Sequence, residues 1–248
     1  MKTATPGLFH GTSSTTQQRP LTLSAYAGPV PPADRAFDDT HGTHADRDPQ
    51  AAAVAAFWAD ARIRGRLNPI EAYTGPGTSD LVPPPAWSFG DDPRLADQLL
   101  DLVLTGQKTA TASALRDYED EARQLAREQD GHAGHEDGDL LVDTDLDLAL
   151  PQPGMLSILL DGAGRPRALI RITDVETVRF GEVSAEHARR EGEGGGSLEH
   201  WRRTHQEFFR RSSATGEPVD ADTLVVLERF EVLVPAQASR AARRNGLA

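Results

Sequence analysis

The sequence predicts an α+β fold, from the order of its periodic segments and from its composition. Helical periodicity occupies the first part of the chain, β-like texture follows residue 150, two further helical segments come next, and a β-like segment ends the apolar region. A doubly wound parallel sheet would instead alternate strands and helices. The chain has 248 residues, 38% of them hydrophobic, which indicates one compact domain with polar additions.

The N-terminal part of the chain divides into a polar leader and a first helix. Residues 1–50 are rich in Thr, Ser, Pro, Asp, Gly and His, with too few large apolar side chains to offset the entropy of ordering, so a disordered leader is predicted. A helix is predicted over residues 51–66. Its apolar face consists of Val54, Phe57, Trp58 and Ile63. Loop signals then dominate as far as Pro85.

The second predicted helix has clear ends. Asp92 precedes Pro93, a pair typical of an N-cap followed by proline at the first helical position. Apolar residues then recur at helical spacing, namely Leu95, Leu99, Leu102 and Val103. Gly106 follows them and ends the helix.

An acidic stretch over residues 117–147 is predicted to be a solvated surface insertion. Its spaced aspartates lack the internal glycine and terminal glutamate of a calcium loop. The chain has no cysteine, which excludes disulfides and thiolate chemistry. We therefore predict neither a metal nor a cofactor.

The C-terminal half reads as a hairpin, two helices and a last strand. Strands are predicted over 155–160 and 168–178, joined by a turn at 161–164. A short helix is expected over 184–190, and a strand over 223–234. Between these, Ser197 can cap a helix with one apolar face, formed by Leu198, Trp201, His205, Phe208 and Phe209.

The remaining residues, 235–248, are basic and are predicted to be a solvated C-terminal tail. The formal charge of −12 and the pI near 5.1 oppose tight, non-specific binding to nucleic acid, which depends on phosphate neutralisation. A nucleotide-sized ligand stays compatible with that charge. The sequence shows no secretory signal and no bilayer-spanning run, so we expect a cytoplasmic protein with no membrane partner. Nothing in it sets an oligomeric state.

Lys108 lies among small and hydroxyl-bearing residues in the segment GQKTATAS, residues 106–113. A cleft at this point could desolvate the lysine and lower its pKa, which is the usual route to a catalytic amine. Alternatively, Lys108 simply follows the helix end and neutralises its last carbonyls.

The glycine-rich run over residues 191–196 carries two glutamates and no following Lys-Ser/Thr pair, which excludes a triphosphate-binding loop. It either places Glu191 or Glu193 near another part of the fold or is a plain surface turn.

Several motifs, in order, resemble the ASCH domain family over residues 51–234. They are FGDD (89–92), TGQKTATAS (105–113), LPQPG (150–154), TDV (173–175), EGEG (191–194) and SLEHW (197–201). The similarity is greatest to the bacterial branch of uncharacterised proteins. The resemblance implies a small PUA-like β-barrel flanked by helices, with a cleft suited to a nucleoside or an RNA base.

A related branch of the family is similar to amidohydrolases that remove the acetyl group from acetylated cytidine. The resemblance implies that Lys108, Thr111 and Glu191 are catalytic, with Glu193 as the alternative to Glu191. Residues of the same motifs are expected to bind the substrate, namely Thr109, Ser113, Glu193 and Trp201.

Amide hydrolysis needs an activated nucleophile, oxyanion stabilisation and protonation of the leaving amine. A neutral Lys108 would serve as base or nucleophile, Thr111 would orient water or donate to the oxyanion, and Glu191 would shuttle the proton. Residues three apart oppose each other on a regular strand, so Lys108 must precede the strand or lie at a bulge.

Two other functions fit the same resemblance. One is a ribonuclease, in which Lys108 would stabilise charge on phosphate; the other is a non-catalytic RNA- or nucleotide-binding regulator. Two features depart from the closest branch. The acidic insertion is long and could overhang the cleft, and Gly195 stands where an aspartate is frequent.

Overall fold

A computed structural model describes residues 48–67, 82–130, 146, 149–213 and 218–247 of the chain. The predicted leader lies outside the described residues except for its last three positions, which begin the first helix. None of the described helices combines the length and the apolar character needed to cross a membrane.

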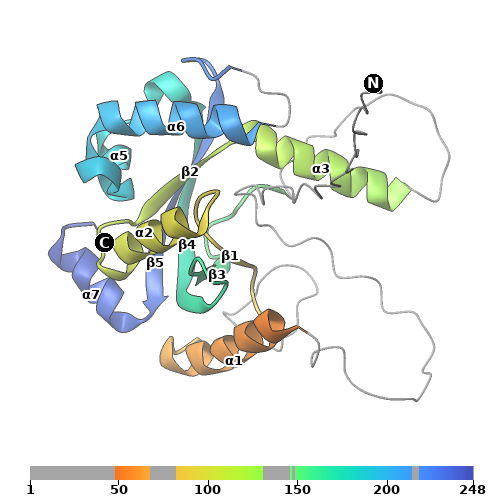
Figure 1. The fold of residues 1–248 in the computed structure, drawn as a ribbon, viewed down its shortest axis with the longest axis vertical. Helices are drawn as coiled ribbons and strands as arrows, with labels where there is room; N and C mark the ends of the chain where they lie inside the picture. The colour runs from red at the N-terminus through yellow and green to blue at the C-terminus, as the bar shows by residue number, and fades with distance from the viewer. Residues whose placement is uncertain (1–47, 68–81, 131–145, 147–148, 214–217, 248) are drawn as a thin grey trace, which may run out of the picture.

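The centre of the fold is one five-stranded sheet in the order β1-β3-β4-β5-β2 (Figure 1). The strands are β1 (Ala86–Trp87), β2 (Ala110–Ala114), β3 (Leu156–Leu160), β4 (Pro166–Arg179) and β5 (Leu224–Val234). β1 runs parallel to β3, and every other pair is antiparallel. Register shifts between β4 and β5, at Leu169/Ile170 and at Ile172/Asp174, locally bend the two long strands. The predicted α+β class and PUA-like architecture are confirmed.

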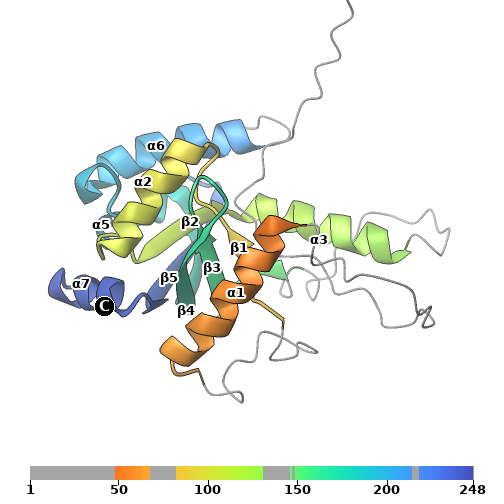
Figure 2. The ribbon, with the colours of Figure 1, turned by 60° about the horizontal axis from the view of Figure 1, so that its bottom comes forward.

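Helices cover this sheet at both ends. The helices are α1 (Pro49–Arg64), α2 (Pro93–Leu104), α3 (Leu115–Asp130), α5 (Ala185–Glu191), α6 (Leu198–Ser212) and α7 (Ala236–Arg244). Two short 3-10 turns, η2 (Phe180–Glu182) and η3 (Glu193–Gly196), flank α5. In both views α5 and α6 lie at one end of the sheet, α1 lies at the other, and α3 extends away from the body (Figures 1 and 2).

The predicted helix starts are confirmed at atomic detail. The Asp92 carboxylate accepts the backbone N–H groups of Arg94 and Leu95 at 2.9 and 3.0 Å, with Pro93 as the first residue of α2. The Ser197 hydroxyl accepts the N–H of His200, and Ser184 caps α5 in the same way. These caps satisfy helix N–H groups that have no partner within the helix.

The acidic segment differs from its prediction. Its first part forms α3, in which Tyr118 and Ala122 are buried and Tyr118 packs against Val226 of β5. The many acidic side chains give this segment the composition of a solvated loop. The segment is nevertheless an amphipathic helix, because only a narrow apolar stripe is needed to pack on the sheet. Residues 131–145 lie outside the described part of the chain.

The C-terminal segment is not the solvated tail that was predicted. It forms α7, and its Ala238, Ala242 and Leu247 are buried. Its buried face consists mostly of alanine, and the three arginines of the helix gave the segment the composition of a basic, solvated tail. The two-residue strand β1 was missed because so short a segment has no measurable periodicity.

We expect Gly106→Ala to destabilise the fold strongly. Gly106 has φ +70°, and a Cβ there would overlap the backbone of Ala241 and Ala242 in α7. Strain and overlap together should lower the free energy of unfolding by about 3 kcal/mol, measured by urea denaturation. Gly154→Ala is the control, since Gly154 also has positive φ but open space around it. Equal losses in the two variants would contradict the proposed packing of α7.

Candidate active site

Lys108 lies in the short connection between α2 and β2, and its side chain is almost completely buried. Its backbone N–H donates to Leu102 O, and the next residue, Thr109, pairs with Arg190 of α5 and Phe230 of β5. Lys108 therefore precedes the strand, as the three-residue spacing to Thr111 required. Lys108 and Thr111 line the same cleft.

The Lys108 ammonium is held between two carboxylates. Its Nζ lies 2.7 Å from Glu191 Oε2 and 2.8 Å from Glu193 Oε1. Burial by itself lowers the pKa of Lys108, but the two adjacent carboxylates outweigh burial and raise it. The expected lowering of the lysine pKa is therefore not what this environment produces, because the cleft supplies negative charge as well as desolvation.

Glu191 is the most constrained member of the cluster. It is fully buried, and its Oε1 accepts Trp201 Nε1–H at 2.7 Å and lies 2.9 Å from His187 Nε2. Burial raises the pKa of Glu191, but Lys108, His205 and the hydrogen bond with His187 together hold it well below the usual range. Glu191 is therefore ionised at neutral pH.

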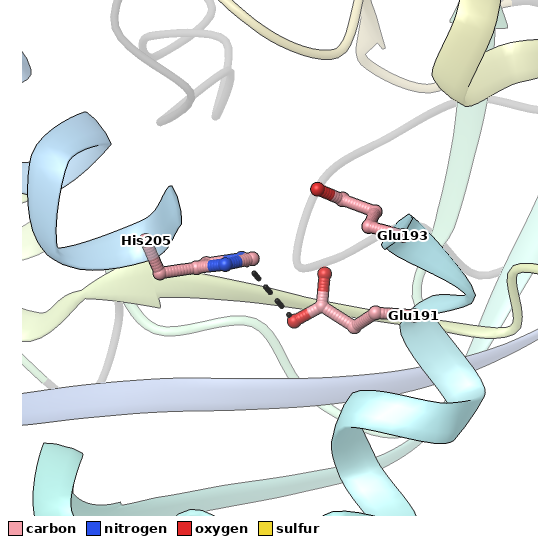
Figure 3. A group of neighbouring side chains, drawn as sticks. All are labelled: Glu191, Glu193 and His205. Atoms are coloured by element: carbon pink, nitrogen blue, oxygen red, sulfur yellow. Dashed lines mark ion pairs between the residues drawn. The ribbon is translucent and has the colours of Figure 1, made fainter. Parts of the chain in front are cut away.

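His205 completes the cluster from α6, opposite the two glutamates (Figure 3). Its Nε2 lies 3.5 Å from Glu191 Oε1, and its Nδ1 is 3.1 Å from the carbonyl oxygen of Trp201, on whose ring it stacks. The carboxylate oxygen of Glu191 and the carbonyl oxygen of Trp201 can only accept hydrogen bonds. Both ring nitrogens of His205 therefore find acceptors when the imidazole is protonated on each of them. Burial lowers the pKa of His205, but the Glu191 carboxylate outweighs this and raises it.

These residues form the floor of a cleft of about 540 Å³. Apolar side chains from α2, α6 and the preceding loop line its walls, namely Phe89, Leu95, Leu99, Leu102 and Phe208. The rim is polar and is formed mainly by α6. A cleft with this size, an apolar wall and a few convergent polar groups is typical of a small-molecule site.

The cleft brings together Lys108, Thr111, Glu191 and Glu193, four of the residues singled out in the sequence. The other three predicted substrate contacts are not on its wall. The Thr109 hydroxyl donates to Leu247 O at 3.3 Å, and Ser113 is buried beside Tyr118. Trp201 contacts Glu191 and His205 of the site without lining the cleft itself. These three residues therefore lie outside the lining of the cleft.

Potential metal ligands also meet here. Donor atoms of Glu191, Glu193 and His205 all lie within 4.8 Å of one another. However, the Lys108 ammonium already bridges both carboxylates and supplies a positive charge between them. The donor set is therefore accounted for by a lysine rather than by a metal ion.

Comparison with known proteins assigns the family. The sequence profile of the ASCH domain matches residues 85–133 and 143–234, which is more than half of the chain. The chain belongs to the ASCH domain family. Its match lies inside the predicted domain, and the gap between its two parts falls in the acidic segment. No curated protein matches the sequence.

Two of the solved structures that are similar to this ASCH domain come from Enterococcus faecalis and Lactobacillus crispatus. A protein from Enterococcus faecalis, assigned to family DUF984, shares 27% identity with a TM-score of 0.53, over 75% of this chain and 93% of that one. An ASCH domain from Lactobacillus crispatus shares 28% identity with a TM-score of 0.48, over 69% of this chain and 94% of that one.

Helix α1 lies outside the ASCH profile match but belongs to the same core. Its Val54 and Trp58 pack with Ile158 and Leu169 of the sheet. Of the acidic segment, the described part forms α3, which lines no wall of the cleft. Gly195, where an aspartate is frequent, lines a separate hollow of about 420 Å³. The two departures in the sequence therefore leave the described walls of the Lys108 cleft unchanged.

Sequence reasoning did not find Glu228, a buried carboxyl behind the cleft of this ASCH domain. It pairs with Thr111 across β5 and β2, and Tyr118 Oη donates to its Oε1 at 3.2 Å. Burial raises the pKa of Glu228 to about 7; the Tyr118 hydrogen bond opposes this rise, and the Glu191 charge adds to it. The available signal was the period of two along β5, because Glu228 shares a face with the apolar residues Val226, Phe230 and Val232, whereas Glu231 lies on the other face.

We expect Glu191→Gln to destabilise the ASCH domain at pH 7 by about 3 kcal/mol or more, because Lys108 and His205 lose a buried counter-charge. The folded pKa of Glu191 lies below its unfolded value, so its contribution is present at neutral pH and lost as the pH falls into the acid range. Chemical denaturation from pH 3 to 8 should show a flatter acid limb in the variant. If the stability of the variant fell in acid as steeply as that of the wild type, the low pKa assigned to Glu191 would be contradicted.

Glu228→Gln should show the opposite pH dependence. The folded pKa of about 7 lies above the ordinary glutamate value, so wild-type stability falls as the pH rises through 7. Relative to wild type, the variant should gain about 2 kcal/mol between pH 5 and pH 8. Denaturant midpoints at the two pH values measure this gain. A constant difference between the two proteins would show that Glu228 does not titrate in this range.

Proposed function

We propose that the protein is an amide hydrolase that removes an acetyl group from the exocyclic amine of a nucleoside base, with acetylated cytidine as the substrate. The observation that carries this proposal is the Lys108 ammonium held between Glu191 and Glu193 at the floor of an apolar-walled cleft. Such a floor offers fixed hydrogen-bond donors and a carboxylate base side by side, which acyl transfer to water requires.

The walls of the cleft suit a planar base. Phe89 and the leucines of α2 offer an apolar face, and Gln98 places an amide on the lining among them. Stacking and apolar contact hold a flat ring with little regard to its hydrogen-bonding pattern, whereas a single amide can read one edge. A ring bound in this way would direct its exocyclic group toward Lys108.

The two glutamates have different environments, which suggests different roles. Glu191 is fully buried and tied to Trp201 and His187, so it positions Lys108 and keeps it charged. The Glu193 side chain is 19% exposed and faces the cleft, so it can meet a water molecule. This favours Glu193 as the general base and assigns Glu191 a positioning role.

The reaction then proceeds by direct attack of water. Glu193 takes a proton from water as the water oxygen bonds to the acyl carbon. The oxyanion that forms is stabilised by Lys108 Nζ–H and by the Thr111 hydroxyl. Collapse of this intermediate re-forms the carbonyl and breaks the C–N bond, while Glu193 returns the proton to the departing nitrogen. The products are the free amine and acetic acid, which ionises to acetate by releasing its proton to water, and Lys108 remains an ammonium throughout.

Incubation of the purified protein with acetylcytidine, followed by chromatography, tests this function. We expect release of cytidine by the wild type and none by Lys108→Ala, because the oxyanion loses its charged donor. Unchanged turnover by folded Lys108→Ala would refute the role of Lys108. No release from the well-folded wild type would refute the amide hydrolase, and salt-sensitive binding or cleavage of RNA would then take its place.

A second variant keeps the test informative if Lys108→Ala does not fold. Thr111→Val removes the hydroxyl but keeps the shape of a strand residue, and it should lower kcat about 100-fold. Thr177→Val makes the same chemical change at an exposed position of β4, outside the cleft, and should retain full activity. Equal rates in both variants would remove Thr111 from the mechanism.

A further inference from the structure

The rim of the cleft carries basic side chains along one face of α6. They are His200, Arg203 and Arg211. Their spacing of three to eleven residues keeps them on one stripe of the helix, about 16 Å long at 1.5 Å per residue. This stripe runs from the glycine-rich turn past the apolar wall, so a ligand whose base occupies the cleft would extend toward it.

The charges on this rim are not equally available. Arg211 is paired with Asp91 at 3.0 Å and lies 3.9 Å from Glu207, which itself holds Arg210 at 2.8 Å. Arg203 is exposed, and within the described ranges it has no carboxylate at ion-pair distance. Its guanidinium is therefore the cation of the rim whose charge is left for a ligand.

Arg203 is also held in place. Its Nη2 lies 3.1 Å from Nδ1 of His200, and since a guanidinium only donates, this nitrogen accepts and the hydrogen of a neutral His200 is on Nε2. The His200 ring lies directly against Gly194, where any Cβ would overlap the imidazole. The glycine-rich turn thus fixes His200, and His200 orients a guanidinium that keeps four N–H donors free for an anion.

We propose that the cleft takes its nucleoside in phosphorylated form, with the phosphate monoester bound by Arg203. This inference rests on the proposed function and names the class of its substrate. A single accessible guanidinium suits one phosphate group, which it can bind in a bidentate way. A continuous RNA backbone would need a run of unpaired cations, whereas Asp91 and Glu207 interrupt the positive charge on this rim.

Equilibrium binding of cytidine and of cytidine monophosphate, measured by calorimetry, tests the proposal without relying on turnover. The wild type should bind the monophosphate about tenfold more tightly than cytidine, and Arg203→Ala should abolish this preference while leaving cytidine binding unchanged. Arg240→Ala is the charge-matched control, because Arg240 is an exposed residue of α7 that lines neither the Lys108 cleft nor the separate hollow that contains Gly195. It should retain the tenfold preference.

A kinetic arm separates this proposal from the proposed function. Acetylated cytidine monophosphate should show a lower KM than acetylcytidine, with a similar kcat, and Arg203→Ala should equalise the two KM values. A monophosphate preference that depends on Arg203 in a protein without turnover would uphold the phosphate site and refute the hydrolase. Turnover with no preference for the phosphorylated substrate would overturn the phosphate site alone.

A third ligand distinguishes the source of the phosphate. A short oligoribonucleotide without terminal phosphate offers only diesters, and we expect it to bind no more tightly than cytidine. If it binds more tightly than the monophosphate and its affinity depends on Arg203, the proposal of a monoester site is overturned in favour of RNA.

Discussion

The fold depends on one buried ion pair, between Lys108 and Glu191. A lysine and a glutamate that are both cut off from water cost several kcal/mol each unless they face one another with good geometry. That requirement ties the α2–β2 connection to the end of α5. His187 of α5 and Trp201 and His205 of α6 surround the other oxygen of the Glu191 carboxylate, so α6 is fixed to the same point. The α2–β2 connection therefore meets two helices at one pair of charges, whose members lie 83 residues apart in the sequence.

The two glutamates that contact Lys108 differ in their access to the cleft. Glu191 is committed to Lys108, whereas Glu193 shares the ammonium but keeps access to the cleft. In the proposed reaction, a carboxylate that stays ionised next to a fixed ammonium leaves the site with charges that need little rearrangement when an oxyanion forms. Preorganisation of this kind costs stability, because paired charges in a core are often no better than apolar residues of the same size. In the proposed complex, the apolar walls hold the base of the nucleotide and Arg203 binds its phosphate.

Much of the fold could be predicted because its signals are local. Asp92 and Ser197 cap helices through contacts within a few residues, and Gly106 ends α2 through its own backbone freedom. Two of the misses have a common cause. The acidic helix α3 and the alanine-rich α7 are amphipathic, but polar and charged residues dominate their composition. Composition therefore indicated solvated segments, although a narrow apolar face of each helix packs against the rest of the fold.

By itself, the sequence determined the α+β class, the order of most elements, and the family resemblance that singled out Lys108, Thr111, Glu191 and Glu193. Those conclusions rest on residue types and spacing, which the chain carries before it folds. Only the tertiary structure decided that Lys108 is charged, because its pKa depends on carboxylates more than eighty positions away in the sequence. For the same reason, the unequal burial of Glu191 and Glu193 and the hidden carboxyl of Glu228 could not be read from the sequence. Charge states are set by desolvation and neighbours in space, and folding alone creates both.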